Sequence, residues 1–367
     1  MTKSYLQYFL GTFLIFVCLV VGINLWVNPY SYYGQMSLGK PHTHNDRLSK
    51  SIFILENNIK IEALLLGSSN SMRFYPDWLE KSFNLSSYNF GLFQASVEDF
   101  YCVTNFVLQK NPGDLKLVVF NLDDWNFSKI EFNSFNILHP ANNRLTSVNS
   151  LARFLDNYEI ITYNLSKLKT AISFDQLSAS VLNIMNLDFK RKRISTDNVF
   201  YQNGVRINYS NSEGENITDL AEKGNYDIST YLAKRHKLLQ TFPGADKLES
   251  QEFFKEFSNE RIMLFESLMK LLKERNVKVI INIMPIQPYE QSIVEKETNY
   301  IERMDFMIDW LNNLKAKNEN ILLVKNNSQI EFFNGFENHF FDAIHPTSVN
   351  SKLMFESIIK NLPKDAI

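Results

Sequence analysis

The chain has few cysteines and no excess of positive charge. The first shortage argues against disulfides and zinc sites, and the second argues against a nucleic-acid partner. Only two of its 367 residues are cysteines. Cys18 lies in an apolar N-terminal stretch and Cys102 in a predicted helix, so a structural disulfide is excluded if that stretch lies in a membrane. No cysteine and histidine cluster has the spacing of a zinc site. A net charge of −2 and an isoelectric point near 6.3 offer no basic surface for nucleic acid.

Apolar and aromatic side chains, by contrast, are abundant. Hydrophobic residues make up 45% of the chain and aromatic residues 14%, with 30 phenylalanines. This composition supplies a large core and makes the chain unlike a disordered one. The length fits one large domain with insertions, or two domains.

An uncharged apolar run near the N-terminus is long enough to cross a bilayer. Tyr8 to Val27 is a run of about twenty mostly apolar residues, and no charge follows it before Lys40. Lys3 precedes the run, and positive charge tends to stay cytoplasmic, so we expect the main domain to be periplasmic or extracellular. A cleaved signal peptide is the alternative, but the run is long and no small-x-small site follows it. Residues 1–27 are therefore expected to be a cytoplasmic tip and a single-pass anchor.

Apolar runs alternate with amphipathic stretches along the rest of the chain, which predicts parallel β-α-β units. The predicted strands are 62–66, 87–90, 115–122, 277–284 and 321–324, and the predicted helices are 77–83, 94–110, 253–275, 299–317 and 347–361. The expected fold is a three-layer α/β domain with a five-stranded parallel sheet.

The predicted elements also define domains. Residues 61–127 and 251–367 form the expected α/β domain, residues 28–60 a connector, and residues 128–250 a largely helical insertion. Long insertions in such sheets tend to carry function. We therefore expect the insertion to cover the site and select the substrate.

The first predicted strand ends in a glycine that is followed by three hydroxyl side chains. Residues 63–66 are apolar, Gly67 ends the run, and Ser68, Ser69 and Ser71 come next. Open α/β sheets place their sites at the carboxyl ends of the strands. Gly-Ser-Ser is also common in plain turns, so the serines alone do not establish a site.

Asp342 and His345 form the second chemical motif, on a loop just before the last predicted helix. Acyl transfer through a serine needs a base for the hydroxyl proton and a carboxylate that holds the imidazole in one tautomer. An aspartate and a histidine three residues apart can supply both groups from one segment. Each residue alone fits a turn or a helix start, but together with the serine strand end they predict nucleophilic catalysis.

These motifs resemble the SGNH (GDSL-like) hydrolase family over about residues 61–126 and 277–361. The family's first block, Gly-Asp/Ser-Ser, matches residues 67–69 and implies Ser69 as the nucleophile. Its last block, Asp-x-x-His, matches Asp342 and His345. The family implies a flavodoxin-like sheet. The residues 28–30 add a likeness to its membrane-anchored, exported branch of the D-alanyl-lipoteichoic-acid and alginate-acetylation type.

The resemblance also implies an oxyanion hole. The amide of Ser69 is one donor, and a second family block carries a glycine after a strand, which Gly91 matches. Gln94 fits the same branch as a substrate-binding residue. The third block departs from the family's Gly-x-Asn-Asp, because residues 123–126 read Asp-Asp-Trp-Asn. Asn126 fits as a donor only after a one-residue slip, and a lost donor can cost on the order of 100-fold in rate.

Other polar residues are weaker candidates. Arg73 is a candidate for binding an anionic substrate, although pairing with a carboxylate is the interpretation we favour. His339 is a candidate for substrate contact. The pair His42 and His44 has no further ligand at a recognisable spacing. The basic run 190–193 fits a solvated face, with an anionic glycan or phospholipid headgroup as the alternative partner.

The resemblance implies an exported, membrane-anchored serine enzyme that moves or removes an acyl group, with acetyl expected, on a cell-envelope glycan. O-acyltransferase and esterase both remain open. The substrate is expected to be the glycan or an acylated carrier, the expected partner is a membrane O-acyltransferase, and no metal or organic cofactor is expected. The alternative is a catalytically weak or inactive protein that uses the same site to bind glycan or the membrane partner.

Overall fold

The computed structural model of the chain describes residues 2–29, 37–39, 46–93, 95–110, 113–128, 171–186, 191–192, 256–297, 299–342 and 344–363. The chain divides into two compact units. The first unit comprises Met1–Asn57 and Ile137–Ser195, and the second comprises Asn58–Asn136 and Thr196–Ile367.

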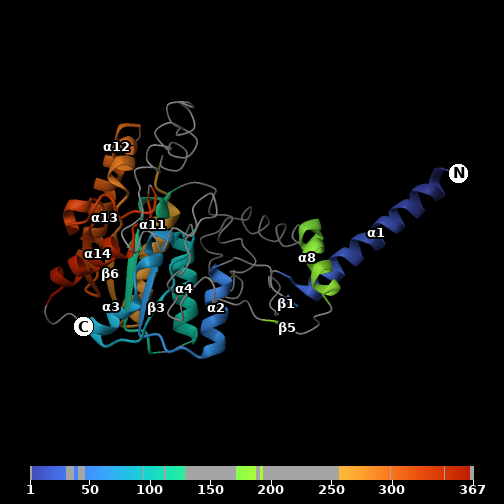
Figure 1. Cartoon of the computed structure of the whole chain (residues 1–367), viewed down its shortest axis with the longest axis horizontal. Helices are drawn as coiled ribbons and strands as arrows, with labels where there is room; N and C mark the ends of the chain where they lie inside the picture. The colour runs from blue at the N-terminus through green and yellow to red at the C-terminus, as the bar shows by residue number, and fades with distance from the viewer. Residues whose placement is uncertain are drawn as a thin grey trace. The chain divides into compact units, whose positions relative to one another are not determined.

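A five-stranded parallel sheet is the centre of the second unit (Figure 1). Its strands are β2 (Ala63–Gly67), β3 (Ser87–Asn89), β4 (Leu117–Leu122), β6 (Lys278–Ile283) and β7 (Ile321–Asn326), in the order β3-β2-β4-β6-β7. Every neighbouring pair is parallel. The predicted α/β class and five-stranded parallel sheet are confirmed. Every residue of β2 and β4 is buried, as expected for strands covered on both faces.

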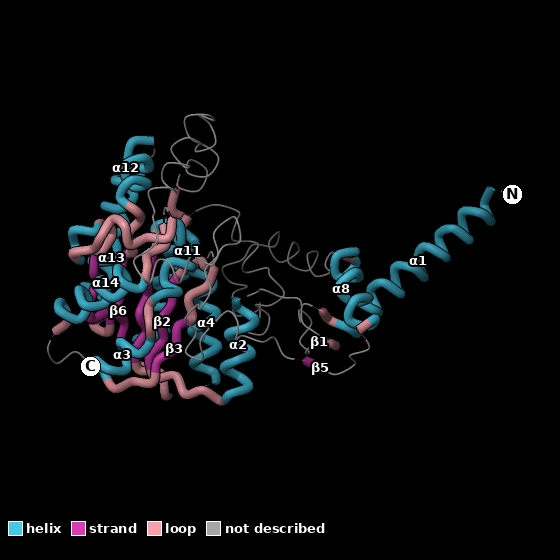
Figure 2. Tube along the Cα trace, viewed as in Figure 1, coloured by secondary structure: helices cyan, strands magenta, loops and turns pink. Residues whose placement is uncertain are grey.

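Helices cover both faces of this sheet (Figure 2). They are α3 (Pro76–Phe83) and α14 (Ser348–Asn361) on one face, and α4 (Val97–Lys110), α11 (Asn259–Glu274) and α13 (Tyr300–Lys317) on the other. Leu65 and Val119 share a core cluster with Met354 of α14. On the opposite face, Phe120 packs against Phe100 of α4 and Phe265 of α11, with ring centroids 5.8 and 5.3 Å apart.

The predicted boundaries differ from the observed ones where polar side chains decide them. Helix α4 begins at Val97 and not near residue 94, because the Asp99 carboxylate accepts the Ser96 N–H at 3.1 Å, as in half of a capping box.

Two of the described helices were not predicted from the sequence. One is α12 (Pro288–Glu297), which has only two aliphatic residues and so no apolar period. The other is α2 (Asp46–Asn57), within the expected connector.

The first unit contains the N-terminal apolar helix α1 (Thr2–Val27). Its residues Tyr5–Val27 are long and apolar enough to cross a membrane. The described part of the predicted insertion includes the helix α8 (Phe174–Met185). It also includes the short strand β5 (Arg191–Lys192), which pairs antiparallel with β1 (Ser37–Leu38). Most of the insertion, as well as His42 and His44, lies outside the described residues.

Candidate active site

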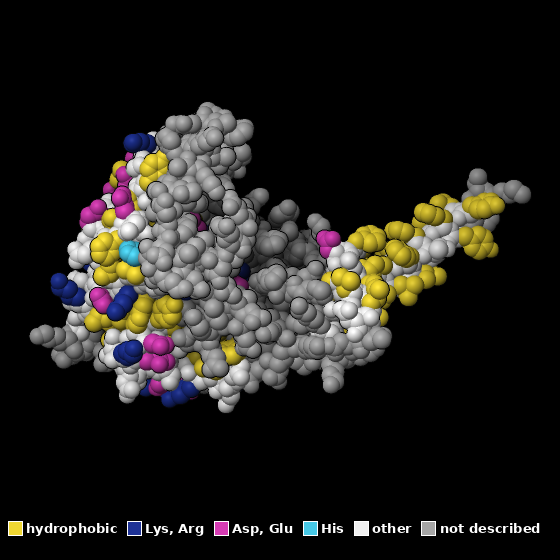
Figure 3. Space-filling model, in the orientation of Figure 1, with side chains coloured by type: hydrophobic (Ala, Val, Ile, Leu, Met, Phe, Trp, Pro, Cys, Tyr) yellow, Lys and Arg dark blue, Asp and Glu magenta, His cyan; other side chains and the backbone are white. Residues whose placement is uncertain are grey.

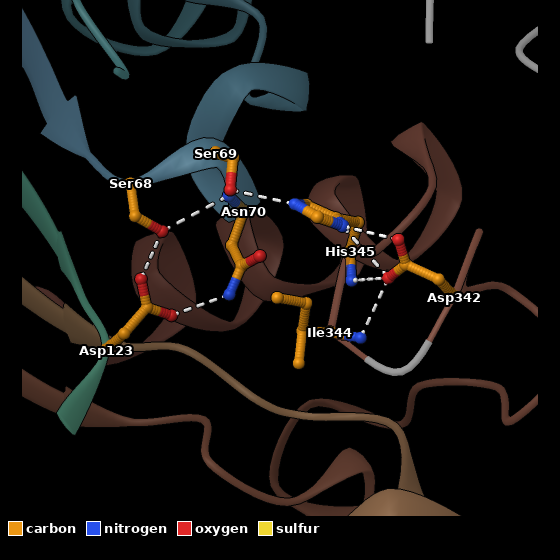
Figure 4. Close-up of polar contacts among 7 residues, drawn as sticks. All are labelled: Ser68, Ser69, Asn70, Asp123, Asp342, Ile344 and His345. Atoms are coloured by element: carbon orange, nitrogen blue, oxygen red, sulfur yellow. Dashed lines mark hydrogen bonds and ion pairs between the residues drawn. The ribbon is translucent and has the colours of Figure 1, made fainter. Parts of the chain in front are cut away.

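Three residues that the sequence predicted to act together meet at the carboxyl end of the sheet (Figure 4). Ser69 follows β2 as the first residue of the short helix η1 (Ser69–Arg73). The Nε2 atom of His345 lies 2.8 Å from the Oγ atom of Ser69, and its Nδ1 atom lies 2.7 Å from Oδ2 of Asp342. Ser69 and His345 are each 8% exposed. The distance of 2.8 Å is within the range for direct proton transfer between a hydroxyl and an imidazole.

A tight turn brings Asp342 and His345 together. Phe340 and Pro346 pair as an antiparallel bridge, and the Phe341 N–H donates to the His345 carbonyl at 2.8 Å. Inside the turn, Oδ1 of Asp342 accepts the backbone N–H groups of Ile344 and His345, both at 2.9 Å. One carboxylate therefore fixes the backbone of the turn and the imidazole at the same time.

The charge of Asp342 follows from these neighbours. Burial by itself raises the pKa of the Asp342 carboxyl, but the attraction of His345 and the hydrogen bonds from His345 and Ile344 outweigh it and lower the pKa. The group is therefore a carboxylate at neutral pH. An ionised Asp342 accepts the Nδ1 proton of His345 and leaves the Nε2 lone pair facing Ser69.

A second carboxylate, Asp123, lies on the opposite side of the Ser69 turn from His345 (Figure 4). Asp123 directly follows β4, the neighbour of β2. The Ser68 hydroxyl donates to its Oδ2 atom, and the Asn70 side-chain amide donates to its Oδ1 atom at 2.7 Å. The residues on both sides of Ser69 are thus held by one side chain. The sequence places this aspartate at the end of a predicted strand but predicts no role for it.

The carboxyl of Asp123 is in a different electrostatic state from that of Asp342. Asp123 is only 3% exposed, and burial raises its pKa to about 7, against the hydrogen bonds from Ser68 and Asn70 that lower it. The neighbouring carboxyl of Asp124 contributes a smaller part of this rise. Asp123 thus titrates near neutral pH, unlike Asp342.

Two glycines are required because Ser71 packs closely between them. A Cβ on Gly67 would lie 2.6 Å from Oγ of Ser71 and 2.7 Å from the carbonyl oxygen of Asn121. A Cβ on Gly91 would lie 2.5 Å from the same Oγ. Ser71 in turn donates to the carbonyl of Ser68 at 2.7 Å. The turn that carries Ser69 is therefore packed directly against the ends of β2 and β3.

The predicted oxyanion donors have different surroundings. The amide of Ser69 is the first of η1, and the first N–H groups of a helix have no partner within it. The amide of Gly91 donates to Oδ1 of Asn89 at 2.7 Å. The side chain of Asn126 is fully buried and donates to the carbonyl of Ala95 at 2.8 Å. Gly91 and Asn126 are thus each held by a neighbour within the fold.

Two of the remaining candidates, Arg73 and His339, contact residues of the loops around Ser69, His345 and Asp342. Arg73 is 3% exposed, donates to the Tyr75 hydroxyl at 3.4 Å, and lies over the ring of Phe341 with 5.4 Å to the centroid. It therefore links η1 to the turn that holds Asp342. The ring of His339 lies 3.4 Å from the hydroxyl of Thr347. Gln94 is outside the described residues.

Metal binding finds no support in the part of the chain that the structure describes. No group of three or more His, Cys, Asp or Glu side chains there could hold a metal ion.

No protein-family model and no curated protein sequence matches the chain. The case for a function therefore depends on the geometry of the site and on the sequence motifs.

Proposed function

We propose that the protein is a serine acyl-transfer enzyme, an O-acyltransferase or an esterase, that acts on acyl esters of a cell-envelope glycan. The observation that carries this proposal is the continuous hydrogen-bonded chain from Ser69 through His345 to Asp342, with distances of 2.8 and 2.7 Å. A serine hydroxyl is a weak nucleophile at neutral pH unless a base lies within hydrogen-bond reach. The identity of the acyl group as acetyl, and of the acceptor as glycan, comes from the motif resemblance.

The reaction proceeds in two steps that use the same three side chains. Nε2 of His345 removes the Ser69 hydroxyl proton as Oγ attacks the ester carbonyl carbon. The imidazolium, stabilised by ionised Asp342, then returns that proton to the leaving alkoxide, and the acyl group stays on Ser69. In the second step His345 deprotonates water or a glycan hydroxyl, whose oxygen attacks the acyl carbon. The bond from that carbon to Oγ of Ser69 then breaks, and the imidazolium returns the proton to Oγ. Water makes the enzyme an esterase, and a glycan hydroxyl makes it a transferase.

The backbone N–H of Ser69 donates a hydrogen bond to the oxyanion that develops on the ester carbonyl oxygen. Preorganised backbone N–H groups at this position stabilise the tetrahedral intermediate in acyl transfer. The amide of Gly91 is engaged by Asn89 in the structure, so it contributes only if it exchanges that partner during the reaction. We therefore expect low turnover on simple esters.

The sheet topology supports an SGNH-like assignment. Numbered along the chain, the strand order is 2-1-3-4-5, the order of flavodoxin-like doubly wound folds. In such sheets ligands bind at the carboxyl ends where the order reverses, which here is between β2 and β4. Ser69 follows β2 and Asp123 follows β4, so the candidate site lies at this switch point.

An uncleaved membrane anchor is part of the proposal. The end of α1 is built into the first unit, since Asn24 and Val27 are both fully buried. Removal of α1 as a signal peptide would break these contacts. With Lys3 on the cytoplasmic side, the main domain is periplasmic or extracellular, where a glycan substrate and a membrane O-acyltransferase partner are accessible.

Labelling with a serine-reactive fluorophosphonate tests the proposed chemistry. The full chain in detergent should be labelled at Ser69, as located by peptide mass spectrometry. Ser69→Ala and His345→Ala should each abolish labelling. Asp342→Asn should slow it by up to ~10⁴-fold, because an asparagine stabilises the wrong imidazole tautomer.

Ser71→Ala is the matched control, because it removes a hydroxyl two residues from Ser69 and leaves the triad intact. This variant should still be labelled at Ser69. Labelling that persists in His345→Ala would mean that the imidazole is not the base. A well-folded protein that takes no label would instead favour the second candidate, a binding protein for glycan or a membrane partner. The bonds that hold Gly91 and Asn126 within the fold are the observation that favours this candidate.

A further inference from the structure

The helix α8 has its polar and apolar faces the wrong way round for a helix in water. Three of its four buried residues are polar, namely Gln176, Ser180 and Asn183, which are 1%, 0% and 3% exposed. Four apolar residues are exposed: Phe174 69%, Val181 40%, Leu182 50% and Met185 71%. A surface helix of a protein in water buries its apolar stripe and exposes its polar one.

Helix α8 lies beside the end of α1 (Figure 2). Its polar residues Gln176 and Ser180 face that helix, because both bond to Asn24. The side chain of Asn24 donates to the carbonyls of Ala171 and Ser173, at 2.9 and 3.2 Å. It accepts from the Ser180 hydroxyl at 3.0 Å, and its backbone carbonyl accepts from Gln176. Asn24 is itself a polar residue within the apolar helix. Its side chain bonds to α8 and to the residues just before α8, and its carbonyl also accepts the Asn28 N–H at 2.9 Å.

Polar groups inside and apolar groups outside is the arrangement that a lipid environment selects. In hydrocarbon no water can satisfy a polar group, so polar side chains pair between helices, while apolar side chains face the acyl chains at no cost. Asp175 is the one charged residue of α8. It is exposed and lies in the first turn, so the rest of the outward side carries no charge.

The place of α8 along α1 fixes its depth in a bilayer. The span Tyr5–Val27 has 23 residues, and a helix of about 20 residues crosses the hydrocarbon core. Asn24, in the last turn of α1, then lies at the outer boundary of the bilayer. Helix α8 has 12 residues, or about 18 Å, too short to cross. Figure 3 shows hydrophobic side chains covering α1 down to the end that meets α8.

We propose that α8 is an interfacial helix that lies in the outer leaflet beside the end of α1, with Phe174, Val181, Leu182 and Met185 among the lipid acyl chains. The inference rests on the membrane anchoring in the proposed function. It adds a second membrane contact to α1. The first unit would then be held at the bilayer surface at two places, and could not turn freely about a single helix.

Spin-label accessibility in lipid nanodiscs tests this placement. The full chain is placed in nanodiscs of phosphatidylethanolamine and phosphatidylglycerol, with a label on Leu182→Cys or Met185→Cys and with Cys18→Ser and Cys102→Ala to remove the native thiols. Both labelled positions are exposed, so the changes leave the packing intact. In lipid, a label is reached more readily by oxygen than by a water-soluble nickel chelate.

Two control labels read the anchor and the aqueous phase separately. A label on native Cys18, in α1, should report lipid. A label on Lys270→Cys, an exposed position of α11, should report water. The proposal expects Leu182 and Met185 to report lipid, as Cys18 does.

Three outcomes overturn the proposal, and they differ in what else they remove. Water accessibility at Leu182 and Met185 while Cys18 reports lipid would mean that α8 lies outside the bilayer and the anchor stands. Water accessibility at Cys18 as well would remove the anchor itself. Protection of Leu182 and Met185 from both reagents would mean that a protein, such as a membrane partner, covers this face.

Discussion

At the scale of residues, Ser69 lies between two carboxyl groups whose surroundings push their pKa values apart. Next to His345, the pKa of Asp342 is lowered and the group stays ionised. Asp123 has no cationic partner among the groups that shift it, and burial raises its pKa to about 7. Asp342 therefore serves the imidazole, while Asp123 holds the turn through Ser68 and Asn70.

The raised pKa of Asp123 predicts a specific pH dependence of stability. In the unfolded chain an aspartate titrates near pH 4, whereas in the fold Asp123 titrates near pH 7. Between these values the folded state binds more protons, so the contribution of Asp123 to stability falls as pH rises, by at most ~1.4 kcal/mol per pH unit. Urea unfolding of wild type and Asp123→Asn should therefore differ in slope between about pH 4 and pH 7.

Ser68→Ala is the companion variant for this measurement. It removes a hydrogen bond that lowers the pKa of Asp123, so the loss of stability should extend to higher pH than in wild type. Identical pH slopes for wild type and Asp123→Asn would show that Asp123 is ionised throughout this range.

The proximity of Ser69, Asp342 and His345 was predictable from the sequence, because acyl transfer through a serine would need these three residue types, and a strand end and a short loop supply them. The pair of hydrogen bonds from Ser68 and Asn70 to Asp123 could not be predicted from the sequence. It joins residues that are 53 and 55 positions apart, and it exists only because β2 and β4 are neighbours. The bonds that hold Gly91 and Asn126 likewise depend on three-dimensional contacts that no local pattern reveals.

At the scale of elements, the turn after β2 leaves no room for a side chain at two glycines packed against it. Gly91→Ala would place a methyl group 2.5 Å from Oγ of Ser71 and 2.9 Å from Oδ1 of Asn89. Overpacking of this kind costs roughly 1–3 kcal/mol. Because the Ser71 hydroxyl is the nearest obstacle, Ser71→Ala should recover much of the stability lost in Gly91→Ala, as measured by urea unfolding.

Gly67→Ala is the comparison that makes this prediction specific. There the added methyl group would also meet the backbone carbonyl of Asn121 at 2.7 Å, which cannot be removed by substitution. Ser71→Ala should therefore rescue Gly91→Ala but not Gly67→Ala. Equal rescue of both glycine variants would contradict the packing described for this turn.

The strands were predictable because each is a short apolar run ended by glycine, proline or polar residues. Helices were predictable where one face is apolar, as in α13. The sequence of α12 lacks that period, and in α2 only one apolar residue, Leu48, precedes Ile52, so both helices were missed. For α8 the sequence predicted only a helical insertion. The buried polar face of α8 depends on its contact with Asn24, a residue about 150 positions earlier in the chain, so no local pattern predicts it.

At the scale of the whole molecule, the apolar helix α1 and the candidate site belong to different units, and each unit is built from two segments of the chain. The segment Ile137–Ser195 belongs to the unit that contains α1. Helix α1 is therefore packed within a unit of its own. A truncated protein that begins after α1 would lack Asn24, the hydrogen-bond partner of Ser180 and Gln176.

The central claim, that Ser69 carries an acyl group during turnover, is tested most directly by trapping that intermediate. The full chain in detergent is mixed with p-nitrophenyl acetate, quenched in acid within the first turnover, and digested for mass spectrometry. We expect one acetyl group on Ser69 in wild type, with a burst of nitrophenolate equal in amount to the enzyme, and neither in His345→Ala. An acetyl group on another residue, or acetylation of Ser69 that persists without His345, would contradict it.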